Sequence, residues 1–234
     1  MPLLVEPDLD ADSLARDHDL ARALDVVLNA RLAAPAAQTP DAEAVALRTF
    51  LVGNGGFRQA SILRAVWGRL TAASSPPFVA CGPAAQQAVA DRYGLPVRLS
   101  PDPEAALAEA QGGARAVIDI ETPRPWWGRL LARPDLRVIG ALPDDTLGLP
   151  RALVVSLEAS GPTGDDRTFW ITDSAMPDAK LVEAMAAIGL VAYPLIAAGG
   201  LKLMVLAGYV QANDGRLSAA PGALKGVIGA APVY

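Results

Sequence analysis

The hydrophobic positions in the first third of the chain recur at helical spacing. In residues 12–34 (DSLARDHDLARALDVVLNARLAA), leucine or valine returns every three or four positions, and Asp12 or Ser13 can cap the start. Residues 41–52, which a glycine-rich turn follows, and residues 57–75 show the same spacing. The pattern predicts three antiparallel helices, each with one apolar stripe that must pack on another helix or on a partner chain.

Beyond residue 75 the period changes. Pro76-Pro77 ends the third helix, and short apolar strands then alternate with helices. The expected elements are the strands FVACG, VRLS and ARAVIDI, helices at 84–93 and 103–111, a short helix at 126–132, and the strands LRVIGALP and RALVVSLE. The order β-α-β-α-β predicts a small parallel sheet. No glycine-rich phosphate loop follows the first strand, so we do not expect a nucleotide site.

The last third alternates in another order. Its expected elements are a strand at 168–172, a helix at 178–188, strands at 191–197 and 201–210, a short segment at 214–224, and the strand GVIGAAPVY. This β-α-β-β-α-β pattern is typical of the ferredoxin-like split unit. We therefore expect a chain of mixed α+β and α/β class in three units: a helical module at 1–75, a single small α/β lobe at 76–160, and a ferredoxin-like domain at 161–234.

Composition narrows the classes of function. The chain has 234 residues, of which 52% are hydrophobic and 19% charged, so it can bury a substantial core. No apolar run approaches the ~20 residues that span a bilayer, and the acidic start MPLLVEPDLD lacks the basic region of a signal peptide. We expect a cytoplasmic protein with no membrane partner. A net charge of −5 gives no electrostatic footprint for nucleic acid.

The single cysteine and the single histidine limit metal chemistry. Cys81 lies in an apolar strand pattern, which predicts an inert core thiol and excludes an internal disulfide. His18 lies among charged residues, which predicts a solvated helix position. We therefore expect no metal and no cofactor.

Several segments, in this order along the chain, resemble one group of proteins. VVLNARLA and ILRAVWGRLTAAS resemble the first and third helices of helical (AroQ-type) chorismate mutases. FVACGP, followed by a helix and YG, resembles the opening of the prephenate dehydratase lobe, which belongs to the periplasmic-binding-like folds. ALKGVIGAAP resembles the closing strand of that family's C-terminal ACT domain. The layout is similar to that of the chorismate mutase and prephenate dehydratase proteins, which act in aromatic amino acid biosynthesis, downstream in the shikimate pathway. It is most similar to a bacterial group labelled chorismate mutase.

The resemblance implies which residues a mutase would use. Rearranging chorismate to prephenate needs cations for two carboxylates and a donor for the ether oxygen, where charge develops. Arg31 matches the arginine that ends the family's first helix, and Glu43 matches the glutamate of its second. The family's other groups are missing here. The family's arginine early in the first helix falls near Leu14, and Ala42 replaces the arginine before the glutamate. No lysine lies between the helices, and Pro76-Pro77 stands where a glutamine is expected.

Two interpretations of this pair remain open. Arg31 and Glu43 are either remnants of a mutase site or, more simply, a solvated helix-end charge and a first-turn acid that the helix dipole favours. An active mutase would have to recruit other cations, for which the candidates are Arg22, Arg48, Arg58 and Arg64.

The dehydratase and ACT parts also depart from the family. The turn after the first strand reads Gly82-Pro83-Ala84-Ala85 in place of Gly-Thr-x-Ser, and residues 78–158 are enough for one lobe only. Without a second lobe no hinged cleft excludes water, so we do not expect dehydration. An amino acid effector is an open alternative that no motif indicates, and we expect the run LKLMVLAGYV at 201–210 to pair as an edge strand across a homodimer.

The tryptophan pair Trp126-Trp127 lies beside Arg124, and together they could hold an aromatic ligand that carries a carboxylate. The alternative is that both indoles cover the core of the lobe. From these observations we expect a degenerate, non-catalytic or weakly active relative, a pseudoenzyme that binds an aromatic or chorismate-derived molecule. The alternative function is an active chorismate mutase with a rebuilt helical site.

Overall fold

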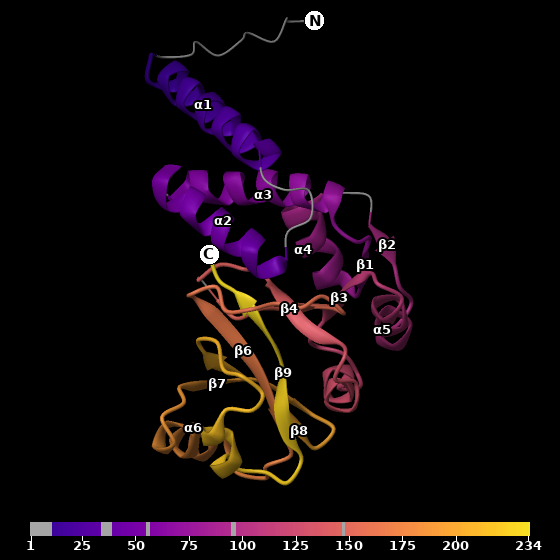
Figure 1. Cartoon of the computed structure of the whole chain (residues 1–234). Helices are drawn as coiled ribbons and strands as arrows, with labels where there is room; N and C mark the ends of the chain where they lie inside the picture. The colour runs from indigo at the N-terminus through magenta and orange to yellow at the C-terminus, as the bar shows by residue number, and fades with distance from the viewer. Residues whose placement is uncertain (1–10, 34–38, 55–56, 95–96, 147) are drawn as a thin grey trace, which may run out of the picture.

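Three helices precede the sheet in the structure, which is a computed structural model (Figure 1). It describes residues 11–33, 39–54, 57–94, 97–146 and 148–234. The helices are α1 (Ala11–Ala33), α2 (Pro40–Asn54) and α3 (Phe57–Ser74), within two residues of the predicted bounds. Their apolar stripes meet in one cluster built on Val27, Leu47, Phe50, Leu63 and Trp67. Among the described helices, none is long and apolar enough to cross a membrane.

Helix α3 also packs closely on α4, the helix that follows the first strand. The approach depends on Gly68 of α3, because a Cβ atom there would lie 2.0 Å from the carbonyl oxygen of Arg92. This contact joins the helices to the sheet and fixes Arg92 beside them. In Figure 1, α2 and α3 lie over one end of the sheet.

The middle of the chain forms one half of the sheet. Its elements are β1 (Phe78–Cys81), α4 (Pro83–Tyr93), β2 (Arg98–Leu99), α5 (Pro103–Gln111), β3 (Arg115–Asp119), the 3₁₀ helix η1 (Trp126–Ala132), β4 (Arg137–Leu142) and β5 (Ala152–Ser156). Strand β1 pairs in parallel with β2 and β3, as the β-α-β-α-β pattern predicts. Strand β5 runs antiparallel to β3 and β4, so the sheet as a whole is mixed.

The last third forms the other half of the same sheet. Its elements are β6 (Asp166–Thr172), α6 (Asp178–Ala187), β7 (Ala192–Ala198), β8 (Leu201–Ala207), the 3₁₀ helix η2 (Gly215–Ala219) and β9 (Lys225–Pro232). The nine described strands lie in the order β2-β1-β3-β5-β4-β9-β6-β8-β7. The two halves join where Val138 of β4 pairs with Gly229 of β9. The structure is therefore mixed α/β with one mixed sheet, and the division into three domains stays a prediction.

The expectation that LKLMVLAGYV forms a free edge strand is wrong. Strand β8 covers most of this run and pairs with β6 on one side and with β7 on the other. Its near-continuous apolar sequence reflects burial on both faces: Leu203, Met204, Val205 and Leu206 are all buried. Strand β7 is the edge at this end of the sheet.

Candidate functional site

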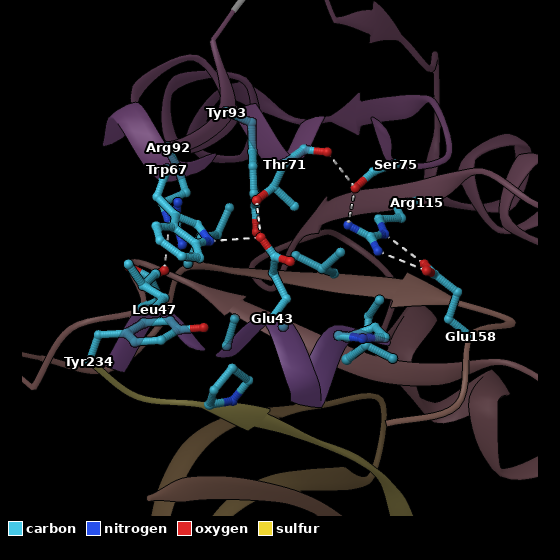
Figure 2. A pocket seen from close by; sticks show the side chains of 18 of the residues that line it. Glu43, Leu47, Trp67, Thr71, Ser75, Arg92, Tyr93, Arg115, Glu158 and Tyr234 are labelled. Atoms are coloured by element: carbon cyan, nitrogen blue, oxygen red, sulfur yellow. Dashed lines mark hydrogen bonds and ion pairs between the residues drawn. The ribbon is translucent and has the colours of Figure 1, made fainter. Parts of the chain in front are cut away.

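A cavity of about 190 Å³ lies where the helices meet the sheet (Figure 2). Helices α1, α2 and α3 supply one wall, and α4 with strands β3, β4 and β5 supplies another. Polar side chains from segments far apart in the sequence converge on it: Arg31, Glu43, Thr71, Ser74, Ser75, Arg92, Tyr93, Arg115, Asp144, Glu158 and Tyr234.

Arg31 and Glu43 face each other inside this cavity. Nε of Arg31 lies 3.0 Å from Oε1 of Glu43, an ion pair whose N–H is not aligned as a hydrogen bond. The same carboxylate oxygen accepts hydrogen bonds from Trp67 Nε1, at 2.7 Å, and from the Thr71 hydroxyl. Arg31 Nη2 donates to Ser74 Oγ at 3.1 Å. Arg31 is only 7% exposed, so the interpretation of it as a solvated helix-end charge is wrong.

A second pair joins β3 to the segment after β5. Arg115 donates from Nε and Nη2 to the two oxygens of Glu158, at 2.6 and 2.7 Å, and from Nη1 to Ser75 Oγ at 2.9 Å. This is the two-pronged geometry that guanidinium and carboxylate favour. Burial alone would raise the pKa of Glu158, but the hydrogen bonds and charge of Arg115 outweigh it, and the pKa lies below its usual value.

A third pair lies at the end of α4. Arg92 Nε donates to Asp144 Oδ2 at 2.6 Å, and Arg92 Nη1 donates to the carbonyl oxygen of Arg64 at 2.6 Å. The Arg64 side chain approaches the other oxygen of Asp144 at 3.3 Å. Asp144 is thus shared by two arginines, one from α3 and one from α4.

The cavity retains unused hydrogen-bond donors although its charges are paired. Within the described part of the chain, neither Arg31 Nη1 nor Arg92 Nη2 donates a hydrogen bond to another residue, and neither do the phenols of Tyr93 and Tyr234. Burial raises the pKa of both tyrosines, so the phenols stay protonated at neutral pH. A ligand with several acceptor oxygens would satisfy these donors.

The three candidate ligand-binding residues Arg124, Trp126 and Trp127 do not form a common site. Trp126 and Trp127 are 2% and 0% exposed and belong to the main core cluster. Trp126 Nε1 donates to the backbone oxygen of Asp119 at 2.7 Å, while Arg124 is exposed. In this arrangement neither indole is open to a ligand, and the three side chains do not line the cavity.

The helix that follows the first strand already carries an internal carboxylate at its N-terminus. Asp119 of β3 accepts the backbone N–H of Ala84 at 3.2 Å and of Ala85 at 2.5 Å. The carboxylate comes so close to the turn that a Cβ atom at Gly82 would lie 2.3 Å from it. Asp119 therefore occupies the position at which a helix N-terminus could bind an external anion.

Three of the four arginines that a mutase site could recruit are described by the structure, and they lie in three different places. Arg22 is exposed beside Asp19, Arg64 supports Asp144 from behind the cavity, and Arg48 contacts the backbone next to Tyr234. The side chain of Arg58 lies outside the described residues.

The cations that do enter the cavity, Arg92 and Arg115, were not found from the sequence. Arg115 opens the apolar strand pattern ARAVIDI, where a charge at a strand position is the one signal that could have identified it, whereas Arg92 follows Asp91 in a helical pattern and gives no such signal.

No family model matches the sequence, and a search of the curated proteins finds no match. One solved structure with a similar chain is described as "GqqA- a novel type of quorum quenching acylases". The two share 15% sequence identity with a TM-score of 0.45, over 67% of this chain and 95% of the other. A likeness this distant carries no information about the activity of this protein.

Proposed function

We propose that the protein binds a small organic acid of the chorismate or prephenate class in this cavity, as a degenerate relative of chorismate mutase and prephenate dehydratase with weak or no turnover. In this proposal α1–α3 correspond to the mutase module, β1–β5 with their helices to one dehydratase-like lobe, and β6–β9 to an ACT-like domain. The protein would act as a binding or regulatory partner in aromatic amino acid biosynthesis, in the cytoplasm and as a homodimer.

One observation carries the proposal. Arg31 and Glu43, which the sequence identifies separately, lie 3.0 Å apart in a cavity that also holds two further arginines, Arg92 and Arg115. The resemblance requires cations for two carboxylates, and Arg31 Nη1 and Arg92 Nη2 are donors that remain free for them among the described contacts. The Tyr93 phenol adds a neutral donor.

The same geometry argues for weak turnover. Each of the three arginines already has a carboxylate partner in Glu43, Asp144 or Glu158, so their formal charges cancel. Mutase catalysis needs donors aimed at the charge that develops in the transition state, and loss of one such donor typically costs about 10²- to 10³-fold in rate. Oxygen Oε1 of Glu43 is also occupied by Trp67, Thr71 and Arg31.

Dehydratase chemistry has less support. The turn that the family uses after its first strand is occupied here by the Asp119 carboxylate. A substrate carboxylate would have to displace this internal group and would meet its negative charge.

An active chorismate mutase is the second candidate, and one observation favours it. Arg92 and Arg115 supply from α4 and β3 the cations that the helical module lacks. A rebuilt site would then use Arg31, Arg92 and Arg115 on the two carboxylates.

A combined assay tests the two candidates. Loss of chorismate absorbance and equilibrium binding of prephenate are measured for the wild type, Arg31→Ala and Glu43→Ala. Arg98→Ala serves as the matched control, because Arg98 forms an exposed pair with Glu109 and neither residue lines the cavity.

Binding without turnover, weakened at least tenfold in Arg31→Ala, supports the binding function. Turnover that either cavity substitution abolishes establishes the mutase and rejects the pseudoenzyme. If the wild type neither binds nor converts these acids, both candidates are wrong.

A further inference from the structure

A column of stacked aromatic rings and guanidinium groups passes the cavity, which four of its six side chains line: Arg92, Tyr93, Arg115 and Tyr234. The ring of Tyr234 lies between two arginines, with the guanidinium carbons of Arg48 and Arg92 each 5.8 Å from its centre. The column continues through Tyr93, 5.1 Å from Arg92, then Phe78, whose ring centre is 4.4 Å from that of Tyr93, and ends at Arg115, 5.7 Å from Phe78. Such contacts are attractive because the ring faces carry partial negative charge.

The column joins parts of the chain that are far apart in the sequence. Arg48 belongs to α2, Arg92 and Tyr93 to α4, and Tyr234 follows β9. Figure 1 shows the chain after β9 running up beside α2, and Figure 2 shows the Tyr234 side chain reaching into the pocket toward Leu47 and Glu43. The last residues therefore bring the C-terminal part of the sheet to the cavity.

Backbone hydrogen bonds hold residues 232–234, which we name the strap. The N–H of Tyr234 donates to the carbonyl oxygen of Asp144 at 2.9 Å, and the N–H of Val233 donates to that of Asp165 at 3.0 Å. Pro232 and Tyr234 both line the cavity. The same residue, Asp144, thus holds Arg92 through its side chain and the strap through its backbone.

Arg48 clamps the strap from the helical side. Its Nη2 donates to the carbonyl oxygens of Val233, at 2.8 Å, and Asp165, at 2.9 Å, and its Nη1 donates to that of Thr163. Within the described residues Arg48 forms no ion pair with a carboxylate, and its hydrogen-bond donors go to backbone oxygens around the strap and to the hydroxyl of Thr163, at 3.2 Å. A forked guanidinium can reach several carbonyls at once, which a lysine ammonium cannot reproduce.

We infer that the strap closes the cavity, that Tyr234 contacts the bound ligand, and that Arg48 is the positioning residue that holds the strap in place. The inference rests on the proposed function for the identity of the ligand, while the strap is a property of the chain alone. The phenol of Tyr234, which donates to no other residue in the described part of the chain, would donate to a ligand oxygen while its ring covers the ligand. A ligand that binds Arg92 would then also lie beside Tyr234, because the Arg92 guanidinium lies over the Tyr234 ring. Binding in the cavity and order in the C-terminal strand β9 are thereby coupled.

Hydrogen–deuterium exchange of the peptide that covers residues 225–234 tests the strap without a ligand. We expect Arg48→Ala to speed exchange at the strap at least tenfold, Arg48→Lys to have a similar but smaller effect, and Arg98→Ala to have none. Unchanged exchange in Arg48→Ala overturns the inference. Circular dichroism of each variant shows whether the fold is retained, and faster exchange throughout the chain, instead of locally, also counts against a clamp.

Prephenate titration tests the ligand contact. We expect Tyr234→Ala to weaken binding at least tenfold and Tyr234→Phe, which loses only the hydroxyl, to weaken it less, while prephenate slows exchange at the strap of the wild type. If the wild type binds prephenate and Tyr234→Ala binds it equally well, the inference fails and the proposed function stands. If the wild type binds neither prephenate nor chorismate, the proposed function and the ligand contact both fail, and the exchange experiment alone decides the strap.

Discussion

The guanidinium of Arg31, which is buried, and the carboxylate of Glu43, whose side chain is 13% exposed, lie 3.0 Å apart between α1 and α2. The pair also involves α3, because Trp67 and Thr71 donate to Glu43 and Ser74 accepts from Arg31. One carboxylate therefore connects all three helices at the wall of the cavity. A buried pair of this kind is both a structural element and the part of the site that a ligand would have to engage.

Replacing one partner of this pair should strongly destabilise the protein. Glu43→Ala leaves the Arg31 charge buried without its partner and removes the acceptor of Trp67, which should cost about 3–5 kcal/mol in free energy of unfolding. Urea denaturation at neutral pH measures this cost. The control is Glu109→Ala, which breaks an exposed ion pair with Arg98 and should cost no more than about 1 kcal/mol. Equal effects of the two substitutions would contradict the buried pair.

The pair between Arg115 and Glu158 predicts a pH dependence. The pKa of Glu158 is lowered in the folded protein, so its stabilising contribution is fully present above the unfolded value of about 4.3 and is lost as the pH falls through the folded value. The difference in free energy of unfolding between the wild type and Glu158→Gln should therefore shrink as the pH drops from 7 toward 3. A difference that stays constant across this range would show that the carboxylate gains nothing from Arg115.

The turn before α4 predicts a coupled pair of substitutions. Gly82 has φ = 99°, and a Cβ atom there would lie 2.3 Å from the carboxylate carbon of Asp119. Gly82→Ala and Asp119→Ala should each destabilise the protein, the second by about 1–3 kcal/mol because two helix N–H groups lose their acceptor. In the double variant the contacts with the carboxylate carbon and oxygen are gone, while Cβ of residue 119 stays 2.8 Å away and the positive φ still strains residue 82. Its cost should therefore be smaller than the two single costs added together. Strict additivity in thermal unfolding would mean that the two residues do not touch.

Cys81 should react with thiol reagents only when the protein unfolds. The residue is 5% exposed, and burial, followed by the nearby charges of Asp119 and Asp102, raises the pKa of its thiol. Labelling with a disulfide reagent at neutral pH should be slow in native buffer and should increase with urea along the unfolding transition. Rapid, complete labelling of the folded protein would contradict the inert core position.

Local structure was largely predictable from the sequence. The helix at 103–111 and the short helix at 126–132 match α5 and η1. A local signal defines the start of α5, because Asp102 accepts the Ala105 N–H at 2.9 Å. The order of strands was less accessible. The run at 201–210 is apolar enough for either an edge or a central strand, and only its two neighbours in the sheet, β6 and β7, decide between them.

The site was predictable only in part, for a similar reason. Arg31 and Glu43 lie at positions that a resemblance can identify, whereas Arg92, Arg115 and Tyr234 reach the cavity through contacts between distant segments. Gly68 illustrates the difficulty, since it brings α3 onto α4 and so places Arg92, yet in the sequence it is an ordinary glycine within a helical pattern. The expected pair Trp126-Trp127 shows the converse, because an aromatic pair that could hold a ligand fills the core instead.

A crystal structure of the protein with prephenate decides whether the cavity is a binding site. We expect the acid to lie between α1–α3 and the sheet, with carboxylate oxygens within hydrogen-bond distance of Arg31 and Arg92 and with the Tyr234 ring against it. An empty cavity in crystals grown at saturating prephenate, or the acid bound elsewhere on the chain, would show that the cavity does not bind this acid.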